Sequence, residues 1–274
     1  MINFIAEILG ALIRLIYNIV GQNYGLSIII FTILTKVLLF PITYKQSKAM
    51  DEMSKLGPIE KEIREKYKGN KEKMSEELMK AYEEHKVNPM GGCLPLLIQL
   101  PIIIAMFYIV KQPLTYIMQM PKEQLQEYTQ EYLGKEEVTD NDIKAYEIQV
   151  ADKNDLINME FAGLDFGDVP SKAFSKNAEE KASYISLLIP VLSLILSLIQ
   201  TKINQKSNKM TEEQLEQQKT MNLMMPIMSA YISYIMPLAL GVYWLLGSVL
   251  QIITQFIINK MLKNQKILIG EGGN

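Results

Sequence analysis

The twenty residues YGLSIIIFTILTKVLLFPIT (Tyr24–Thr43) decide the fold class of this chain. Apart from Lys36 they carry no charged side chain, and a run of this length lets a helix cross the ~30 Å hydrocarbon core of a bilayer. A lysine inside such a run costs roughly 2.5–3.5 kcal/mol on insertion scales, and the surrounding apolar residues offset it at roughly 0.3–0.6 kcal/mol each. The stretch therefore predicts a membrane-spanning helix that carries a cation.

Four further apolar runs predict four further spans. They cover residues 93–111, 184–201, 221–237 and 239–259, and a tight turn at Pro237 separates the last two. None of the five predicted spans contains an Asp or a Glu. Such long runs with few charges are typical of helices in lipid rather than of a soluble core. We therefore expect an all-α, polytopic membrane protein with five transmembrane helices, the first over residues 24–43.

The segments between the spans are polar and differ in character. Residues 45–87 contain eleven Lys and Arg and ten Asp and Glu up to Lys86, and apolar residues recur among them every three or four positions. This pattern predicts a helical hairpin in water. Residues 112–182 hold fifteen acids and seven lysines, which predicts an acidic extracellular loop. Residues 202–220 and 260–274 are expected to form a cytoplasmic loop and a cytoplasmic tail.

The N-terminal residues 1–22 have a two-sided pattern. Asn3, Glu7, Arg14 and Asn18 repeat at multiples of three to four and share one helical face, while Ile and Leu occupy much of the rest. No basic region precedes the apolar stretch, which argues against a signal peptide. The pattern predicts an amphipathic helix in the membrane interface, with a sixth span as the alternative.

Lysine and arginine in the loops set the expected orientation. Five spans place the hairpin, the 202–220 loop and the tail on one side, and the N-terminus and the acidic loop on the other. The first set carries the excess of lysine beside the spans, as at Lys45, Lys202 and Lys260. Cytoplasmic loops carry such an excess, so we expect the N-terminus outside and the C-terminus in the cytoplasm.

Several classes of function have no support in the sequence. The single Cys93 excludes an internal disulfide, and together with the single His85 it argues against a Cys- or His-based metal site. No Gly-rich phosphate loop is present. We therefore expect no enzymatic activity, no catalytic residue, no cofactor and no metal.

Lys36 is the residue that points most directly to a function. Ionisable residues inside a membrane usually face a bundle interior or a water-filled cavity. Because no predicted span offers a carboxylate, Lys36 needs water or an incoming anion. The alternative is that its side chain snorkels to the interface near Pro41. Its candidate neighbours are all uncharged polar groups of the spans: Thr32, Thr35, Gln99, Ser193, Ser197, Gln200, Ser248 and Gln251.

Three stretches together carry a resemblance to a known family. They are Tyr24–Met50, the string EEHKVNPMGGCLPLLIQLPI (residues 83–102) and LALGVYWLLGSVLQIITQ (residues 238–255). They resemble the YidC/Oxa/Alb family of membrane protein insertases, in its Gram-positive bacterial form. The likeness runs from about Tyr24 to Lys263 and leaves out most of residues 112–160.

The resemblance implies a core of five helices around a hydrophilic groove that opens to the cytoplasm and to lipid. It places Lys36 where the family usually has arginine, which keeps the charge but loses bidentate pairing. It further implies that clients contact groove residues on several spans: Lys36, Thr32, Gln99, Ser193, Ser197, Gln200, Tyr243, Trp244, Ser248 and Gln251. Two features depart from common relatives, because no lipid-modified N-terminal cysteine is present and the basic tail is short.

The function that this resemblance implies is membrane protein insertion. Short acidic or polar outer segments of nascent clients would enter the positive groove, and client helices would then pass into the lipid bilayer. The Sec translocon, the signal recognition pathway and the ribosome are possible partners, and no specific nucleic acid is expected. The alternatives are a small-solute transporter or channel, and an assembly factor that does not insert. The expected location is the bacterial plasma membrane.

Overall fold

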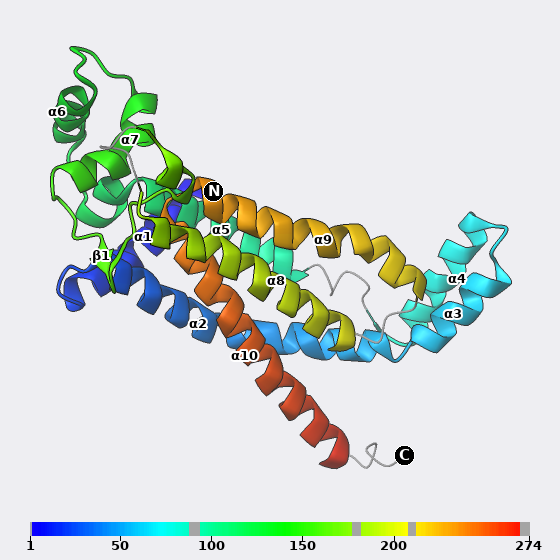
Figure 1. Cartoon of the computed structure of the whole chain (residues 1–274). Coiled ribbons are helices and arrows are strands. Elements are labelled where there is room, and N and C mark those ends of the chain that lie inside the picture. Colours follow the sequence, from blue (N-terminus) through cyan, green and yellow to red (C-terminus); the bar gives the residue numbers. More distant parts are fainter. Residues whose placement is uncertain (1, 88–93, 177–181, 208–211, 269–274) are drawn as a thin grey trace.

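The computed structural model describes residues 2–87, 94–176, 182–207 and 212–268. Long helices run lengthwise through the middle of the molecule, and a smaller folded part lies at each end (Figure 1). The N-terminal helix lies at one end with the acidic residues 112–176, and the charged hairpin lies at the other. The C-terminal end of the last helix points away from the acidic end.

The first two helices meet at the acidic end. Helix α1 (Ile2–Ile19) buries Ile13, Ile16 and Tyr17 in the main core, where it packs against α2 and α5. Helix α2 (Tyr24–Ser54) begins at Asn23, whose side-chain oxygen accepts a hydrogen bond from Leu26 N at 2.8 Å. This Asx cap satisfies one of the backbone donors that a helix start leaves open.

Helix α2 extends well beyond the predicted span. It continues through Pro41 to Ser54, so residues 24–43 and the first ten residues of the predicted hairpin form one continuous helix. Proline is tolerated in membrane helices because neighbouring groups satisfy the freed carbonyl. The rest of the hairpin consists of α3 (Gly57–Lys66) and α4 (Lys71–Glu84), which pack through Leu56, Leu78 and Tyr82. These three residues form a small apolar core that holds the short pair together.

Residues 112–176, which were expected to form a polar loop, contain several short helices and a pair of strands. Beyond α5 (Leu94–Lys111) the chain forms an array of short elements whose apolar side chains, among them Ile148, Val150 and Phe166, join the main core. This burial explains the difference from the expected loop, because apolar side chains from several short elements meet in one core while most of the acids, with the exception of the buried Glu147, lie outward. The elements are the π-helix η2 (Leu114–Met118), α6 (Lys122–Leu133), α7 (Asp140–Lys153), the paired strands β1 (Glu160–Phe161) and β2 (Leu164–Asp165), and the 3-10 helix η3 (Pro170–Phe174).

The C-terminal half supplies three long helices. A 3-10 turn η5 (Tyr184–Leu187) leads into α8 (Leu188–Ser207), which packs against α9 (Glu212–Ile235) and α10 (Leu238–Leu268). A break at Met236 and Pro237 separates α9 from α10, where a turn was expected. Helices α8 and α9 extend into the expected 202–220 loop, of which residues 208–211 lie outside the described residues.

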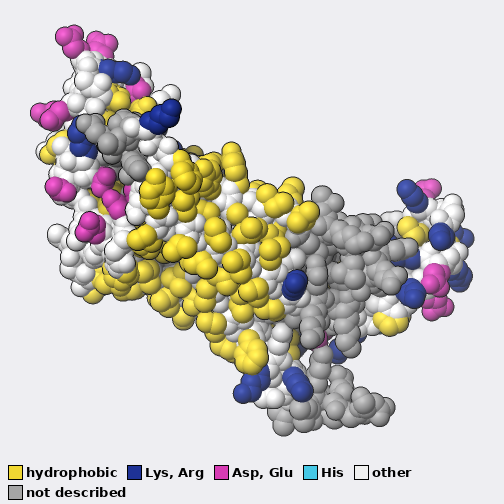
Figure 2. All heavy atoms as spheres, in the orientation of Figure 1, with side chains coloured by type: hydrophobic (Ala, Val, Ile, Leu, Met, Phe, Trp, Pro, Cys, Tyr) yellow, Lys and Arg dark blue, Asp and Glu magenta, His cyan; other side chains and the backbone are white. Residues whose placement is uncertain are grey.

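Three of the described helices are long and apolar enough to cross a membrane: Tyr24–Ser54, Tyr184–Ile203 and Leu238–Gln265. Two shorter apolar helices, Gln99–Lys111 and Leu223–Ile235, accompany them. Figure 2 shows hydrophobic side chains covering the middle of one face, with acidic and basic side chains gathered at the two ends. These helices agree with the prediction of an all-α polytopic membrane protein, and five spans around a groove stay a prediction.

Candidate functional site

Lys36 contacts the last helix rather than the helices next to it in sequence. Its Nζ donates a hydrogen bond to Gln251 Oε1 at 3.3 Å, which joins α2 to α10. Gly247 lies one turn before Gln251, and a Cβ at that position would lie 3.8 Å from Lys36 Cε. The lysine stem therefore passes close to the backbone of α10 at Gly247, at a distance that would still accept a Cβ. The side chain of Lys36 is half-buried.

No negative charge neutralises Lys36 in the part of the chain that the structure describes. Its recorded polar contact there is the neutral amide of Gln251, and the recorded ion pairs all lie in the two polar ends. The hydroxyls of Thr32 and Thr35 donate to carbonyls of their own helix, to Ile28 O at 2.6 Å and to Phe31 O at 2.9 Å. A cation within an apolar helix that lacks a negative partner attracts an anionic group or water.

A second polar contact joins α5 to α10. Gln99 Nε2 donates to the Tyr243 hydroxyl oxygen at 3.3 Å, and the tyrosine side chain is buried. Tyr243 lies two turns before Gln251 on the same helix, so polar groups follow α10 from one contact to the next. The structure therefore brings four of the ten predicted residues into two hydrogen-bonded pairs that share α10.

Ser193 and Ser197 take part in a different interface. Both are buried where α8 packs against α9, and the Ser233 hydroxyl of α9 donates to Ser193 Oγ at 3.3 Å. Ser229 lies one turn before Ser233 on α9 and is also buried. We call Ser193, Ser197, Ser229 and Ser233 the serine seam. The structure records no contact between this seam and Lys36 among the described residues.

The remaining three predicted residues lie on α8 and α10 without a recorded side-chain partner in the described part. Gln200 and Trp244 are half-buried, and Ser248 is buried. Ser229 and Ser233 were missing from the predicted site. Their spacing of four repeats that of Ser193 and Ser197, and comparing the two patterns would have indicated that α8 and α9 present matching polar faces.

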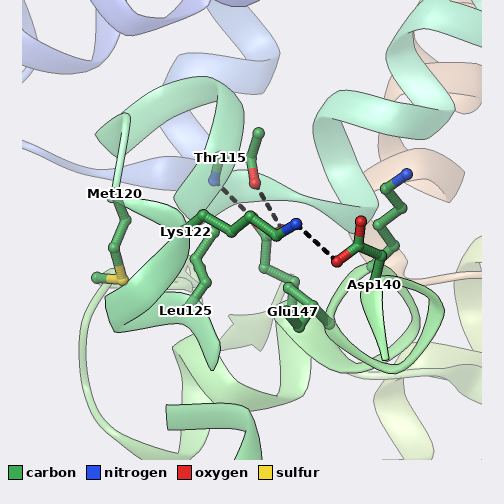
Figure 3. A pocket seen from close by; sticks show the side chains of 8 residues that line it. Thr115, Met120, Lys122, Leu125, Asp140 and Glu147 are labelled. Atoms are coloured by element: carbon green, nitrogen blue, oxygen red, sulfur yellow. Dashed lines mark hydrogen bonds and ion pairs between the residues drawn. The ribbon is translucent and has the colours of Figure 1, made fainter. Parts of the chain in front are cut away.

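The acidic end contains a pocket with a buried carboxylate at its base (Figure 3). Glu147 Oε1 accepts from Thr115 N at 2.6 Å and Glu147 Oε2 accepts from the Thr115 hydroxyl at 2.8 Å, which ties α7 to η2. Burial raises the pKa of Glu147 to about 7, against the hydrogen bonds from Thr115. Lys122 and Asp140 form an ion pair of 2.9 Å at the rim. None of these residues was among the predicted site residues.

Among the described residues no group of three or more His, Cys, Asp or Glu side chains is placed to hold a metal ion. The predicted polar residues of the spans are amides, hydroxyls and one ammonium. Such a set can position a polar or anionic segment by hydrogen bonds and charge.

Comparison with known proteins adds a family likeness to this geometry. A family model described as "60Kd inner membrane protein" matches residues 15–266. A protein of Fusobacterium nucleatum named "Membrane protein insertase YidC" is 47% identical over 109 residues, which cover 40% of this chain and 53% of that protein.

Two further relatives carry the same name. The protein of Geotalea daltonii is 52% identical over 86 residues, 31% of this chain and 16% of its own length. That of Syntrophus aciditrophicus is 50% identical over 95 residues, 35% of this chain and 17% of its own length. The matched part is thus about half of the first relative and under a fifth of the other two. These likenesses and the apolar helices support a multi-pass protein of the bacterial inner membrane.

Proposed function

The chain belongs to the YidC/Oxa/Alb family, the 60Kd inner membrane protein family, and on that premise we propose that it inserts client proteins into the membrane. The observation that carries this proposal is Lys36, a cation within an apolar helix whose recorded polar partner is the neutral Gln251. A site of this kind suits transient contact with a negative or polar segment, because no resident carboxylate has to be displaced first.

The proposed site is a hydrophilic groove between α2, α5 and α10. Lys36 and Gln251 form one part of its lining, and Gln99 and Tyr243 form another. The acidic outer segment of a client enters the groove, where Lys36 lowers the cost of taking a carboxylate out of water. Gln200, Trp244 and Ser248 belong to the same lining in this proposal, and Thr32 lies beside Lys36 on α2.

Release into lipid completes the proposed cycle. The apolar client helix leaves sideways into the bilayer, and the transfer of its apolar surface out of water drives the step. Charge attraction and burial suffice for this cycle, and no covalent bond forms or breaks. The polar ends fit the same proposal, with the hairpin of α3 and α4 in the cytoplasm and the acidic end outside. The clients are nascent membrane proteins, handled alone or with the Sec translocon, the signal recognition pathway and the ribosome.

The test is insertion of a single-span client with a short acidic outer tail into liposomes that contain the purified protein. We expect Lys36→Arg to retain insertion, because the positive charge remains. We expect Lys36→Ala and Lys36→Glu to lose it. Lys45→Ala is the matched control, because Lys45 is an exposed lysine of the same helix and its loss removes the same net charge.

Each outcome bears on one part of the proposal. Insertion by Lys36→Glu at the level of the unchanged protein would rule out an electrostatic role for this position. A folded protein that inserts no client at all would exclude the insertase proposal itself. An equal loss in Lys45→Ala would mean that overall charge matters, and that Lys36 has no special place.

A further inference from the structure

One segment of the acidic end contacts the first turns of both helices that carry the Lys36–Gln251 pair. At α2, the carbonyl of Asn158 accepts a hydrogen bond from Tyr24 N at 3.1 Å, and the carbonyl of Glu160 accepts from Asn23 Nδ2 at 3.0 Å. Asn23 therefore performs two tasks, because its Oδ1 caps α2 and its amide nitrogen holds the β1 strand. The start of α2 is thus attached to residues 158–160.

The same segment reaches the start of α10 a few residues later. The carbonyl of Phe166 accepts from Ala239 N at 3.0 Å, and the carbonyl of Asp168 accepts from Leu238 N at 2.7 Å. The first backbone donors of a helix have no partner within the helix. Residues 158–168 supply such partners to two different helices, and this stretch of eleven residues connects their ends.

Close packing holds this segment against α2. A Cβ at Gly25 would lie 2.7 Å from Phe161 Cβ and 3.0 Å from Phe166 Cε2, so a larger residue would push the segment away. The rings of Phe161 and Phe166 meet edge to face with their centroids 6.3 Å apart. Phe166 and Tyr24 are buried in the main core. The contact is therefore a packed one and does not depend on hydrogen bonds alone.

Lys36 and Gln251 lie equally far along their helices from the ends that residues 158–168 contact. Lys36 lies twelve residues after Tyr24, and Gln251 lies twelve residues after Ala239. Both helices start at the acidic end and run away from it (Figure 1). Because each residue of an α-helix advances about 1.5 Å, the two side chains reach the same depth, roughly 18 Å from the attached ends. If one helix slid along the other by one turn, Gln251 Oε1 would shift by about 5 Å relative to Lys36 Nζ, and the hydrogen bond would be lost.

We propose that residues Asn158–Asp168 act as a brace that holds the starts of α2 and α10 in register, and that Asn23 is a positioning residue for the Lys36–Gln251 pair. The brace sets the depth and separation of the two helices at the site where clients are received. This inference rests on the proposed insertase function, and it gives a part of the acidic region a role in that function.

The first test measures the separation of α2 and α10 with spin labels in the full-length protein in liposomes. Labels are attached to Ile42→Cys and Phe256→Cys, which are exposed and lie beyond the Lys36–Gln251 pair, in a Cys93→Ser background. Asn23→Ser keeps an oxygen to cap α2 and removes the amide that holds Glu160 O. We expect it to broaden the distance distribution between the labels.

The matched control is Thr139→Ala, which removes the cap of α7 within the acidic region and leaves residues 158–168 unchanged. We expect the distribution in this variant to equal that of the unchanged protein. Equal distributions for Asn23→Ser and the unchanged protein would overturn the assignment of Asn23 as a positioning residue, since its bond to Glu160 O would then not influence the two helices. Equal broadening in Asn23→Ser and Thr139→Ala would also overturn it, because general loosening of the acidic region would then be the cause.

The second test replaces the contact between Asn23 and residues 158–160 by a disulfide that can be formed and reduced. Asn23 and Asn158 pair across an isolated parallel β-bridge, so their Cα atoms fall within the range that a disulfide spans. In Asn23→Cys with Asn158→Cys and Cys93→Ser, we expect the oxidised form to insert the client at the normal rate. After reduction we expect a rate about threefold lower, the effect typical of losing one hydrogen bond within a membrane protein, because the bond from Asn23 to Glu160 O is then absent.

The two tests separate this inference from the proposed function. If the protein inserts no client, the insertase proposal fails while the spin-label distances still decide whether the brace exists. If the distances change as expected but reduction leaves insertion unchanged, the brace holds the helices without positioning the site, and the inference is overturned.

Discussion

Among single residues, the proposed function depends most on Lys36, a cation within an apolar helix whose recorded polar partner is the neutral Gln251. The position of a lysine within an apolar run, in a chain whose spans lack acids, was enough to predict a cation without a counter-ion. The choice of Gln251 among several neutral candidates was not predictable. It depends on how α10 lies beside α2, and residues 158–168, which contact the starts of both helices, are distant in sequence from Lys36 and from Gln251.

A change at Gln251 tests whether the neutral partner matters. Gln251→Glu would place a carboxylate about where the amide oxygen now accepts from Lys36. We expect the pair to neutralise the site and to reduce the insertion rate of acidic clients about tenfold, or about 1.4 kcal/mol in the barrier. The liposome assay measures this rate. Gln255→Glu, one turn further along α10, is the control that we expect to retain insertion, and an equal loss there would count against a special role of Gln251.

Glu147 gives the acidic end a predictable pH dependence. Its pKa is raised to about 7 by burial, so the folded state holds a proton that the unfolded state releases above about pH 4.5. Stability from this group is present below the unfolded pKa and is lost as the pH rises through 7, an effect on the order of 3 kcal/mol. The pKa of Asp152 is raised to about 6 by burial and by Asp165 and Asp168, and it acts with the same sign.

We therefore expect the melting temperature of the reconstituted protein to fall between pH 5 and pH 8. In Glu147→Gln this fall should be smaller, because the amide stays neutral and its oxygen can still accept from Thr115. The slope that remains in this variant belongs to the other carboxyl groups whose pKa is raised by burial, which are Asp152, Asp168 and Glu60. Identical slopes for the variant and the unchanged protein would mean that Glu147 does not titrate in this range.

Among the helices, the sequence predicted which segments are apolar better than it predicted where each helix ends. Hydropathy marks the apolar part of a helix, and it does not register that α2 continues through a polar stretch to Ser54. The folded acidic region escaped prediction for another reason. Its buried residues come from several short elements, such as η2 and α7, and none of these carries a long periodic pattern. The packing of these elements into one core is seen in the structure and could not be predicted from their sequences.

The serine seam predicts opposite effects for two neighbouring substitutions on α9. Ser233→Ala removes the hydrogen bond to Ser193 and should lower the free energy of unfolding by about 0.6 kcal/mol, the average for such bonds between membrane helices. The Ser229 hydroxyl is buried with no hydrogen-bond partner among the described residues. Ser229→Ala should therefore leave stability unchanged or raise it.

The measurement is the free energy of unfolding of the purified protein in detergent micelles, with both variants compared under the same conditions. The two serines lie on one face of one helix, so each serves as the control for the other. A loss of stability in Ser229→Ala at least equal to that in Ser233→Ala would show that the seam does not depend on the recorded bond.

At the scale of the whole molecule, charge and apolar surface are separated along the long axis. The acidic region and the charged hairpin occupy opposite ends, and apolar side chains cover the visible middle (Figure 2). This separation was predictable, because it follows the order of polar and apolar segments in the chain. The connection of α2 to α10 by residues 158–168 was not predictable. It depends on hydrogen bonds between backbone groups, and these do not require particular residue types.

If the charge of Lys36 selects the client segment that crosses, reversing the charge of both the site and the client should reverse the preference. Two clients that differ in a single outer residue, Asp or Lys, are offered to the unchanged protein and to Lys36→Glu in liposomes. We predict that the unchanged protein inserts the Asp client faster and that Lys36→Glu inserts the Lys client faster. The same preference in both proteins would contradict this role of Lys36.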